Sequence, residues 1–477
     1  MHNIARRVTS NFTWLLVSDF LSKGAMFLGT LYIARVLEAA EFGLFSFALV
    51  VSNYMWVATD LGVSQYGTRE VARSPDRAEE ILRLLNSLRF IASILTFIAL
   101  FLILTIADVS SHKRSVLLAA GLYAIAYALS PDWLLRGAET MKYLAIGNLV
   151  MGFTFLSSIF FLVKAPEDTT WAAFLWSFSF FLGSVVMIYL LWRKLGIKFF
   201  LTFSLSKWKE HLKESVYFAI VGSLLRVYGY IPLFLLGFLV APEQLGIFSA
   251  PHRLVITLLT FNFVVPRAFY PVLASLHQNP EAFRKANENY RRIMIAIGLP
   301  IGVGGTILAG HIIHILYGSS YIEGTNILKI LIWQVPIGYM ILTYGNPLSV
   351  LGLQRPYALA LGAGVLITVI LNLVLIPIYG TYGAAFAASA GAGIILLFLI
   401  FIFSAKAYRS IPFDTYFLKV CIACVFMGVI IKIIDVNIVI RLVLGALSYG
   451  VIAMALGITT RKDILGFYSI ISNRKKG

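Results

Sequence analysis

The feature that most constrains this chain is a succession of apolar stretches, each about 20 residues long, joined by short polar connectors. A helix needs about 20 apolar residues to cross the hydrocarbon core of a bilayer. Hydrophobic residues make up 59% of the 477 residues and charged residues only 13%, whereas soluble domains carry about 25% charged residues. We therefore predict an all-α, polytopic membrane protein, because helices satisfy their own backbone hydrogen bonds at membrane depth.

The apolar stretches predict about fourteen transmembrane helices. They lie at roughly 12–34, 43–63, 87–107, 115–133, 143–163, 171–192, 215–239, 246–271, 293–316, 327–350, 357–377, 383–404, 414–434 and 438–458. The connectors are too short to form a soluble catalytic or nucleotide-binding domain, which generally needs 50 or more residues, about the lower limit for a domain.

Lysine and arginine fall very unequally on the two sides of this topology. One set of connectors and ends holds 27 of them, and the opposite connectors hold Lys113, Arg114, Lys164 and Arg441. The positive-inside rule therefore predicts a multi-pass protein of the cell (cytoplasmic, inner) membrane with both termini cytoplasmic. The same bias and the attraction of anionic lipid headgroups account for the formal net charge of +17, so no nucleic-acid partner is expected.

The chain also repeats itself at a nearly constant spacing. Residues 37–46 resemble 240–249 at an offset of 203, and residues 137–147 resemble 352–362 at an offset of 215. A third match, Ala-Ala-Phe at 172 and at 384, keeps the same order. These matches predict two pseudo-symmetric six-helix lobes, residues 1–195 and 196–408, related by an axis along the membrane normal. Residues 409–477 then add two transmembrane helices and a cytoplasmic tail.

Ionisable residues inside the predicted helices are the candidate site, because a charge at mid-bilayer costs about 2.5–3.5 kcal/mol. Lys23 and Arg226 are 203 positions apart, in equivalent helices of the two lobes, and Arg253 lies in the next helix. Cations at one depth in both lobes would face a central cleft, where arginine suits phosphate. We therefore expect Lys23, Arg226 and Arg253 to bind an anionic substrate, although a snorkelling position explains Arg253 equally well.

Two carboxylates are candidates for ion coupling. Asp19 lies one helical turn before Lys23 on the same face. It either neutralises Lys23 so that the helix inserts, or exchanges a proton or sodium ion during transport. Asp60 lies close to the cytoplasmic end of the second predicted helix, where helix capping or a solvated edge would equally account for it.

Several functional classes lack the residues that they need. No connector carries a phosphate-binding Walker loop, a paired-aspartate motif or a Ser/His/Asp set, so neither catalysis nor a cofactor is expected. Cys421 and Cys424 have the spacing of a redox or metal motif but lie within an apolar helix without further ligands. We interpret them as packing residues and predict no metal site.

A set of short segments, taken together, resembles the prokaryotic polysaccharide and O-antigen repeat-unit flippases. They are residues 11–14, 33–37, 41–46, 60–62, 69–73, 131–139, 232–237, 245–250 and 372–380. The resemblance extends over essentially the whole chain and implies membership of the multidrug/oligosaccharidyl-lipid/polysaccharide exporter superfamily. One departure is Glu38-Ala39-Ala40, where that family usually has a turn resembling Gly-Pro.

The resemblance implies a V-shaped cavity between two lobes and movement of a polyprenyl-pyrophosphate-linked oligosaccharide to the outer leaflet by alternating access. Membrane lipids surround such a protein, and a polysaccharide polymerase or glycosyltransferase is a candidate partner. Because one chain holds both lobes, we expect a monomer. The alternative is a cation-coupled multidrug antiporter of the same superfamily, which would favour acidic residues in the cleft and could use Asp19. A membrane-embedded glycosyltransferase is disfavoured, because no connector could hold its catalytic loop.

Overall fold

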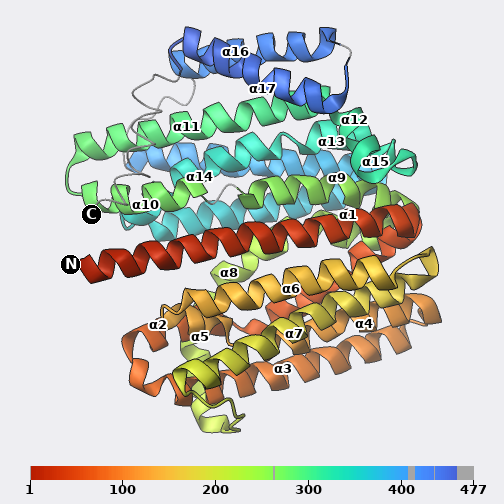
Figure 1. The fold of residues 1–477 in the computed structure, drawn as a ribbon, viewed down its shortest axis with the longest axis vertical. Helices are drawn as coiled ribbons and strands as arrows, with labels where there is room; N and C mark the ends of the chain where they lie inside the picture. The colour runs from red at the N-terminus through yellow and green to blue at the C-terminus, as the bar shows by residue number, and fades with distance from the viewer. Residues whose placement is uncertain (1, 262–263, 407–413, 435, 459–477) are drawn as a thin grey trace. The chain divides into compact units, whose positions relative to one another are not determined.

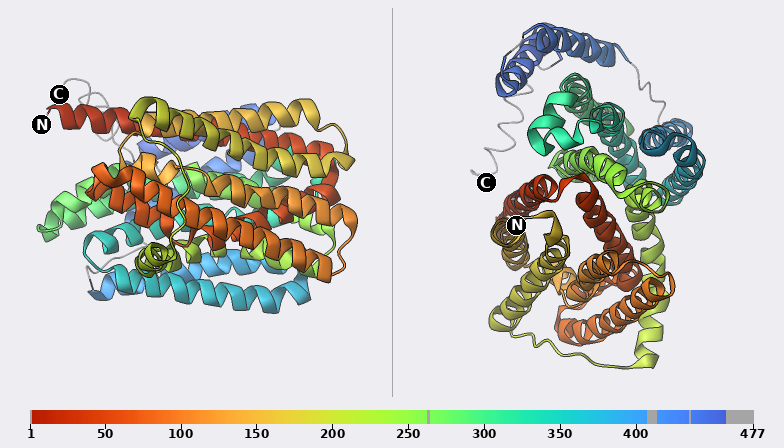
Figure 2. Two further views of the ribbon diagram at one scale, coloured as in Figure 1. Left: turned by 90° about the horizontal axis from the view of Figure 1, so that it is seen from below. Right: turned by 90° about the vertical axis from the view of Figure 1, so that its right-hand side faces the viewer.

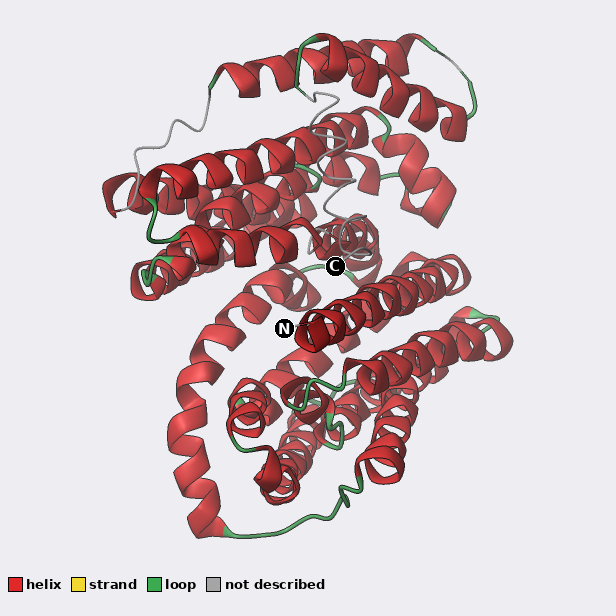
Figure 3. Ribbon diagram, turned by 60° about the vertical axis from the view of Figure 1, so that its left-hand side comes forward, coloured by secondary structure: helices red, strands yellow, loops and turns green. Residues whose placement is uncertain are grey.

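The computed structural model describes residues 2–261, 264–406, 414–434 and 436–458. Helices dominate the described part, which contains no strand (Figures 1 and 3). In chain order they are α1 (His2–Asp60), α2 (Val63–Arg73), α3 (Ala78–Ile106), α4 (Ser111–Ala128), α5 (Asp132–Gly137), α6 (Met141–Leu162), α7 (Thr169–Leu195), α8 (Leu205–Leu239), α9 (Pro242–Phe261), α10 (Val264–Leu276), α11 (Pro280–Ile307), α12 (Ala309–Tyr317), α13 (Gly324–Leu331), α14 (Gln334–Val350), α15 (Gln354–Lys406), α16 (Thr415–Ile433) and α17 (Ile438–Ala455).

The predicted class, an all-α polytopic membrane protein, is confirmed. Among the described residues, eight helices are long and apolar enough to cross a membrane, or nine when α11 and α12 are taken as one bent span. The longest of the eight, Gln354–Ala405, covers two of the predicted transmembrane segments. Helices α11 and α12 meet at an angle of 78°. They share the single predicted transmembrane segment 293–316, which is therefore bent. The bend follows Gly304 and Gly305, and glycines weaken a helix at such a point.

Two helices contain a sharp break where two predicted transmembrane segments meet. In α15 the break is at Gly380, with φ 56° and ψ −132°. In α1 it is at Glu38, with φ 60° and ψ −178°. Only glycine adopts the second conformation without a cost of about 1–3 kcal/mol. Glu38 therefore lies in a strained turn at the place where the sequence departs from the Gly-Pro-like turn of the family that it resembles.

Residues 1–249 form one compact unit, whose helices are seen mostly end-on in the right panel of Figure 2. Helix α1 packs along α6, and a Cβ on Gly152 would come within 2.6 Å of the Ser22 carbonyl oxygen. Helix α7 is tied to α4 by hydroxyl groups that donate to backbone carbonyls: Ser177 Oγ to Ala119 at 2.8 Å and Ser184 Oγ to Ala126 at 3.1 Å. Small residues and hydroxyl hydrogen bonds hold helices together in membranes, where the hydrophobic effect between helices is absent.

Within this unit, α1 and the first turns of α9 cross at two glycines. A Cβ on Gly43 would lie 2.8 Å from the Gly246 backbone nitrogen and would overlap the Pro242 carbonyl oxygen. A Cβ on Gly246 would lie 2.7 Å from the Ala39 carbonyl carbon and would overlap the Ala39 oxygen. Each glycine therefore faces the residue four positions before the other glycine. Because the two segments are 203 positions apart, the contact is reciprocal, like an isologous contact between two subunits.

Residues 250–477 form the second compact unit. Helix α16 is held to α11 by an ion pair between Arg291 Nη2 and Asp414 Oδ2 at 2.7 Å. Helix α17 contributes Tyr449, whose hydroxyl donates to the Ala296 carbonyl at 2.8 Å. The division of the chain at 195 and 408 inferred from the repeat stays a prediction, as does its symmetry.

Membrane topology is testable with labels on two connectors. Asp76 and Glu167 are exposed, whereas Thr169, which also lies in the second connector, is buried. In a background lacking Cys421 and Cys424, we expect D76C to react with an impermeant maleimide only after the cytoplasmic face is opened, because of the positive-inside rule. We expect E167C to react in intact cells or spheroplasts. Reaction of both sites from the same side would refute the predicted topology.

Candidate functional site

The predicted ion pair on α1 is present. Lys23 Nζ lies 3.5 Å from Asp19 Oδ2, and the two side chains are 41% and 24% exposed. Both positions adjoin Ser18 and Ser22, which are buried against the rest of the unit. The pair therefore lies at the border of the packed face of α1, where an ion or an anionic group could still reach it.

The positions of the other two predicted cations relative to this pair lie outside what the structure describes. The Arg226 side chain lies outside the described residues, although its backbone is helical in α8. Arg253 belongs to the other compact unit, on α9, where it is partly buried. A common cationic site of Lys23, Arg226 and Arg253 thus stays a prediction.

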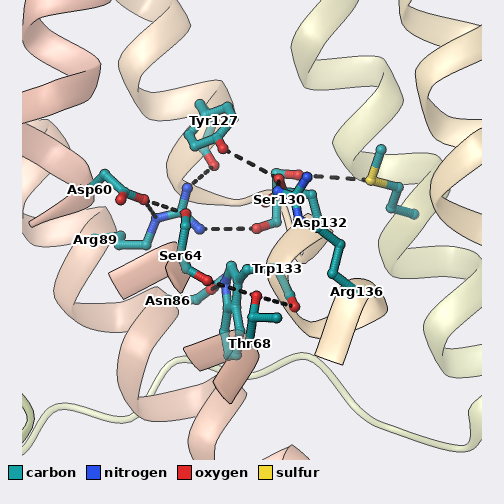
Figure 4. Close-up of polar contacts among 11 residues, drawn as sticks. Asp60, Ser64, Thr68, Asn86, Arg89, Tyr127, Ser130, Asp132, Trp133 and Arg136 are labelled. Atoms are coloured by element: carbon teal, nitrogen blue, oxygen red, sulfur yellow. Dashed lines mark hydrogen bonds and ion pairs between the residues drawn. The ribbon is translucent and has the colours of Figure 1, made fainter. Parts of the chain in front are cut away.

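Asp60, the second candidate for ion coupling, belongs to a buried polar network in the first unit (Figure 4). Arg89 of α3 has no exposed side-chain surface, and its Nε lies 3.7 Å from Asp60 Oδ1. Ser64 Oγ also donates a hydrogen bond to Asp60 Oδ1. Buried charges persist in proteins when they are paired and hydrogen-bonded, so Asp60 is a compensated carboxylate in this structure.

Arg89 also joins α3 to the end of α4. Its two terminal nitrogens donate to the carbonyl oxygens of Ser130 at 3.2 Å and Tyr127 at 3.0 Å. Its guanidinium carbon lies 4.8 Å from the centroid of the Tyr127 ring. The Ser130 carbonyl thereby gains a donor beyond the end of α4, and the Tyr127 carbonyl, which already accepts from the Ser130 backbone N–H at 3.0 Å, gains a second one.

A second ion pair continues the network on the other side of Tyr127. The Tyr127 hydroxyl donates to Asp132 Oδ2 at 3.3 Å, and Arg136 is paired with the same oxygen from one turn later in α5 (Figure 4). Asp132 Oδ1 is buried without a hydrogen-bond partner. The network therefore carries two carboxylates and two guanidinium groups, and its formal charge is zero.

Hydrogen bonds between neutral groups also hold this network in place. Trp133 Nε1 donates to Asn86 Oδ1 at 3.0 Å, and Thr68 Oγ1 donates to the Trp133 carbonyl at 2.9 Å. Gly67 leaves room for the Trp133 ring, because a Cβ there would approach the ring to 2.5 Å. The ends of α1 and α4 and the first half of α3 are thereby fixed to α2 and α5. We interpret the network as a rigid support for these helix ends.

Arg89 is one of the 27 lysines and arginines that the charge bias places on the cytoplasmic side, whereas the structure buries it within a helix that spans Ala78–Ile106. A signal was available, since Asn86 and Arg89 are three residues apart and share one face of an apolar helix. Their partners, Asp60 and Trp133, are distant in sequence and could not be assigned. Among the described residues, no group of three or more His, Cys, Asp or Glu side chains is arranged to hold a metal ion.

Comparisons with known proteins agree on the type of molecule. Residues 8–277, more than half of the chain, match the family model described as polysaccharide biosynthesis protein. A relative from Escherichia coli K12, named for O-antigen transport, is 22% identical over 247 residues, which cover 51% of this chain and 59% of the relative. The chain spans only 59% and 62% of the first curated relatives it matches.

Solved structures share the fold over nearly the whole chain. A lipid II flippase, MurJ, in an inward closed conformation has a TM-score of 0.70 at 16% identity and covers 92% of this chain and 97% of its own. A multidrug resistance transporter of the MATE family in an outward-facing conformation has a TM-score of 0.52 at 15% identity, over 83% of this chain and 96% of its own. At these identities the likeness establishes the fold alone.

Proposed function

Because the chain belongs to the polysaccharide biosynthesis protein family, we propose that it is a flippase that moves a polyprenyl-pyrophosphate-linked oligosaccharide across the cell membrane. The observation that carries the proposal is the family match over residues 8–277. The likeness to the lipid II flippase over 92% of the chain supports it, since that protein is named for a lipid-linked substrate. No chemical step is needed, and the described residues are used for packing and pairing.

Movement would follow an alternating-access scheme. Two lobes, residues 1–195 and 196–408, would expose a central site first to the cytoplasm and then to the outside. The polar glycan and its pyrophosphate would cross through the site, while the polyprenyl tail stays in the hydrocarbon. This arrangement avoids the cost of moving a pyrophosphate through the bilayer core, which no lipid environment could repay.

We propose that Lys23, Arg226 and Arg253 attract the pyrophosphate. The half-exposed ammonium group of Lys23 is the best supported of the three, because it can reach an ion from its place beside Asp19. A phosphate oxygen accepts strong, charge-assisted hydrogen bonds from lysine and arginine. Binding would then compete with Asp19 for Lys23, which links substrate binding to the state of the carboxylate.

Of the two ion-coupling candidates, the geometry favours Asp19. Its side chain is 24% exposed and paired at 3.5 Å with a lysine that is itself exposed. Asp60 is 10% exposed and faces a fully buried arginine. A carboxylate that exchanges a proton or sodium ion must be reachable by it, and the Asp19 side chain is the more exposed of the two.

Neutral glutamine at each cation is the direct test. We expect K23Q, R226Q and R253Q each to lower glycan export by about tenfold or more, since loss of one charge-assisted hydrogen bond costs about 1.5–3 kcal/mol. Export is measured as surface polysaccharide in a strain deleted for the gene, with membrane protein level as the control for insertion. K23R should retain more export than K23Q. Wild-type export by all three glutamine variants would refute the cationic site.

The same export assay, together with a measurement of drug resistance, distinguishes a flippase from the alternative multidrug antiporter. A multidrug antiporter would leave surface polysaccharide unchanged on deletion and would confer drug resistance that D19N abolishes. A flippase coupled through Asp19 would lose export in D19N, with no change in drug resistance. A monomer with cytoplasmic termini is sufficient for either scheme, and a polymerase or glycosyltransferase partner would act on the product or supply the substrate.

A further inference from the structure

The segment that follows α7 and includes the first turns of α8, residues 196–215 (the connecting segment), packs against the rest of residues 1–249. Ser87 Oγ donates to the Thr202 carbonyl at 2.6 Å, and Trp208 is buried with Nε1 donating to the Leu84 carbonyl at 3.2 Å. Further contacts continue along it: Lys198 N to Glu79, Lys207 to Glu80, Tyr66 to His211 and Arg69 to Glu214. The connecting segment is therefore an ordered part of residues 1–249.

The side of the connecting segment that is left uncovered is strongly apolar. Phe200, Phe203 and Leu205 are 57%, 60% and 81% exposed. The Phe200 ring is held by the guanidinium group of Arg83, whose carbon lies 5.3 Å from the ring centroid. Three large apolar side chains, exposed close together on an ordered segment, indicate a surface that meets another apolar phase.

Cationic residues precede and follow these three residues in the sequence. Between residues 193 and 213 the sequence holds six of them and one acidic residue, Glu210: Arg193, Lys194, Lys198, Lys207, Lys209 and Lys213. All six are exposed, and Lys207 pairs with Glu80. Lys209 and Lys213 follow Leu205 at four-residue steps, so the three share one side of α8.

The direction of the segment fits a membrane surface. In the right panel of Figure 2, α8 is seen lengthwise where the other long helices of residues 1–249 are seen end-on, and Figure 3 shows the same crossing direction. Helices that cross a bilayer run close to its normal, so an element that runs across them lies closer to its plane. Exposed apolar side chains with lysines beside them, at the start of such an element, are typical of an interfacial segment.

We propose that the connecting segment, residues 196–215, is a binding surface for anionic phospholipids in the membrane leaflet. Phe200, Phe203 and Leu205 enter the boundary between headgroups and acyl chains, and Lys209 and Lys213 contact the phosphates. A partner protein could cover the apolar side chains, but it would have to match a wide cationic field at the level of the bilayer. A leaflet of anionic lipids supplies both properties at once.

The position of Phe203 relative to the bilayer is measured first. The full-length protein, without Cys421 and Cys424, carries a bimane label at F203C or at E210C and is placed in nanodiscs. Glu210 lies about 200° around the helix from buried Trp208, which directs it away from the bundle. We expect lipids brominated on the upper acyl chain to quench the F203C label, and aqueous iodide to quench the E210C label. Quenching of the F203C label by iodide but not by brominated lipid would overturn the proposal.

Charge is tested with a matched pair of double variants. Native mass spectrometry from mixed micelles of phosphatidylglycerol and phosphatidylcholine gives the occupancy of the anionic lipid. We expect K209Q/K213Q to lower the apparent affinity for phosphatidylglycerol by at least about fivefold, since each lysine at an anionic surface contributes about that factor. R284Q/K285Q removes the same charge from two exposed residues of α11 and should leave it unchanged. Equal losses in both double variants would refute a specific surface on the connecting segment.

Discussion

Replacing Arg89 with methionine is expected to destabilise the protein by about 3–5 kcal/mol, because it leaves the Asp60 carboxylate buried without its cation. Methionine preserves most of the apolar volume, so the loss reports the charge and its hydrogen bonds. The carbonyl oxygens of Ser130 and Tyr127 each lose the Arg89 donor in the same variant. The measurement is thermal unfolding in detergent, followed by size-exclusion chromatography.

Two further variants make the Arg89 test specific. D60N/R89M removes both charges and should recover a large part of the loss, because neither partner is left as an uncompensated ion. R83M removes a partly exposed arginine one and a half turns earlier, which pairs with Glu79, and should cost less than about 1 kcal/mol. If R89M is as stable as R83M, the network does not support the helix ends.

The class of the protein could be predicted from its sequence because the signal is local. Each apolar stretch carries its own hydrophobicity, so α6 and α7 are found close to their predicted ranges. Helix α3 ends close to its predicted end but begins nine residues earlier, at Ala78 instead of residue 87. The Asp19–Lys23 pair was predictable for the same reason, since four residues along a helix set the distance between them.

The parts that were missed depend on tertiary structure or on unusual backbone geometry. From the sequence, Arg89 is interpreted as a cytoplasmic charge. Only the structure shows that it pairs with Asp60, because nothing in a single sequence links the two residues. Glu38 has no local property that favours a left-handed backbone, and it is held at φ 60° only because α1 must reverse there. The distance of Lys23 from Arg226 and Arg253 depends on how the two lobes are arranged. The sequence predicts that arrangement only through its internal repeat.

The reciprocal glycine crossing leads to the second large effect. Alanine at Gly246 is expected to cost about 3 kcal/mol, the upper end of the range for overpacking, because its Cβ would overlap the Ala39 carbonyl oxygen. A backbone atom cannot rotate away as a side chain does, so α1 and α9 must separate. Alanine at Gly43 should be comparably harmful, since its Cβ would overlap the Pro242 carbonyl oxygen in the equivalent half of the contact.

Gly393 supplies the control for both variants, because a Cβ there meets no atom within 4 Å. G393A should be neutral or gain up to about 1 kcal/mol from the better helix propensity of alanine. Thermal stability and glycan export are measured for all three alanine variants. Equal defects in G43A and G246A mean that the crossing acts as one reciprocal contact, as two copies of a repeat predict. A defect in only one of them would separate the two halves and remove the argument that the offset of 203 reflects symmetry at this point.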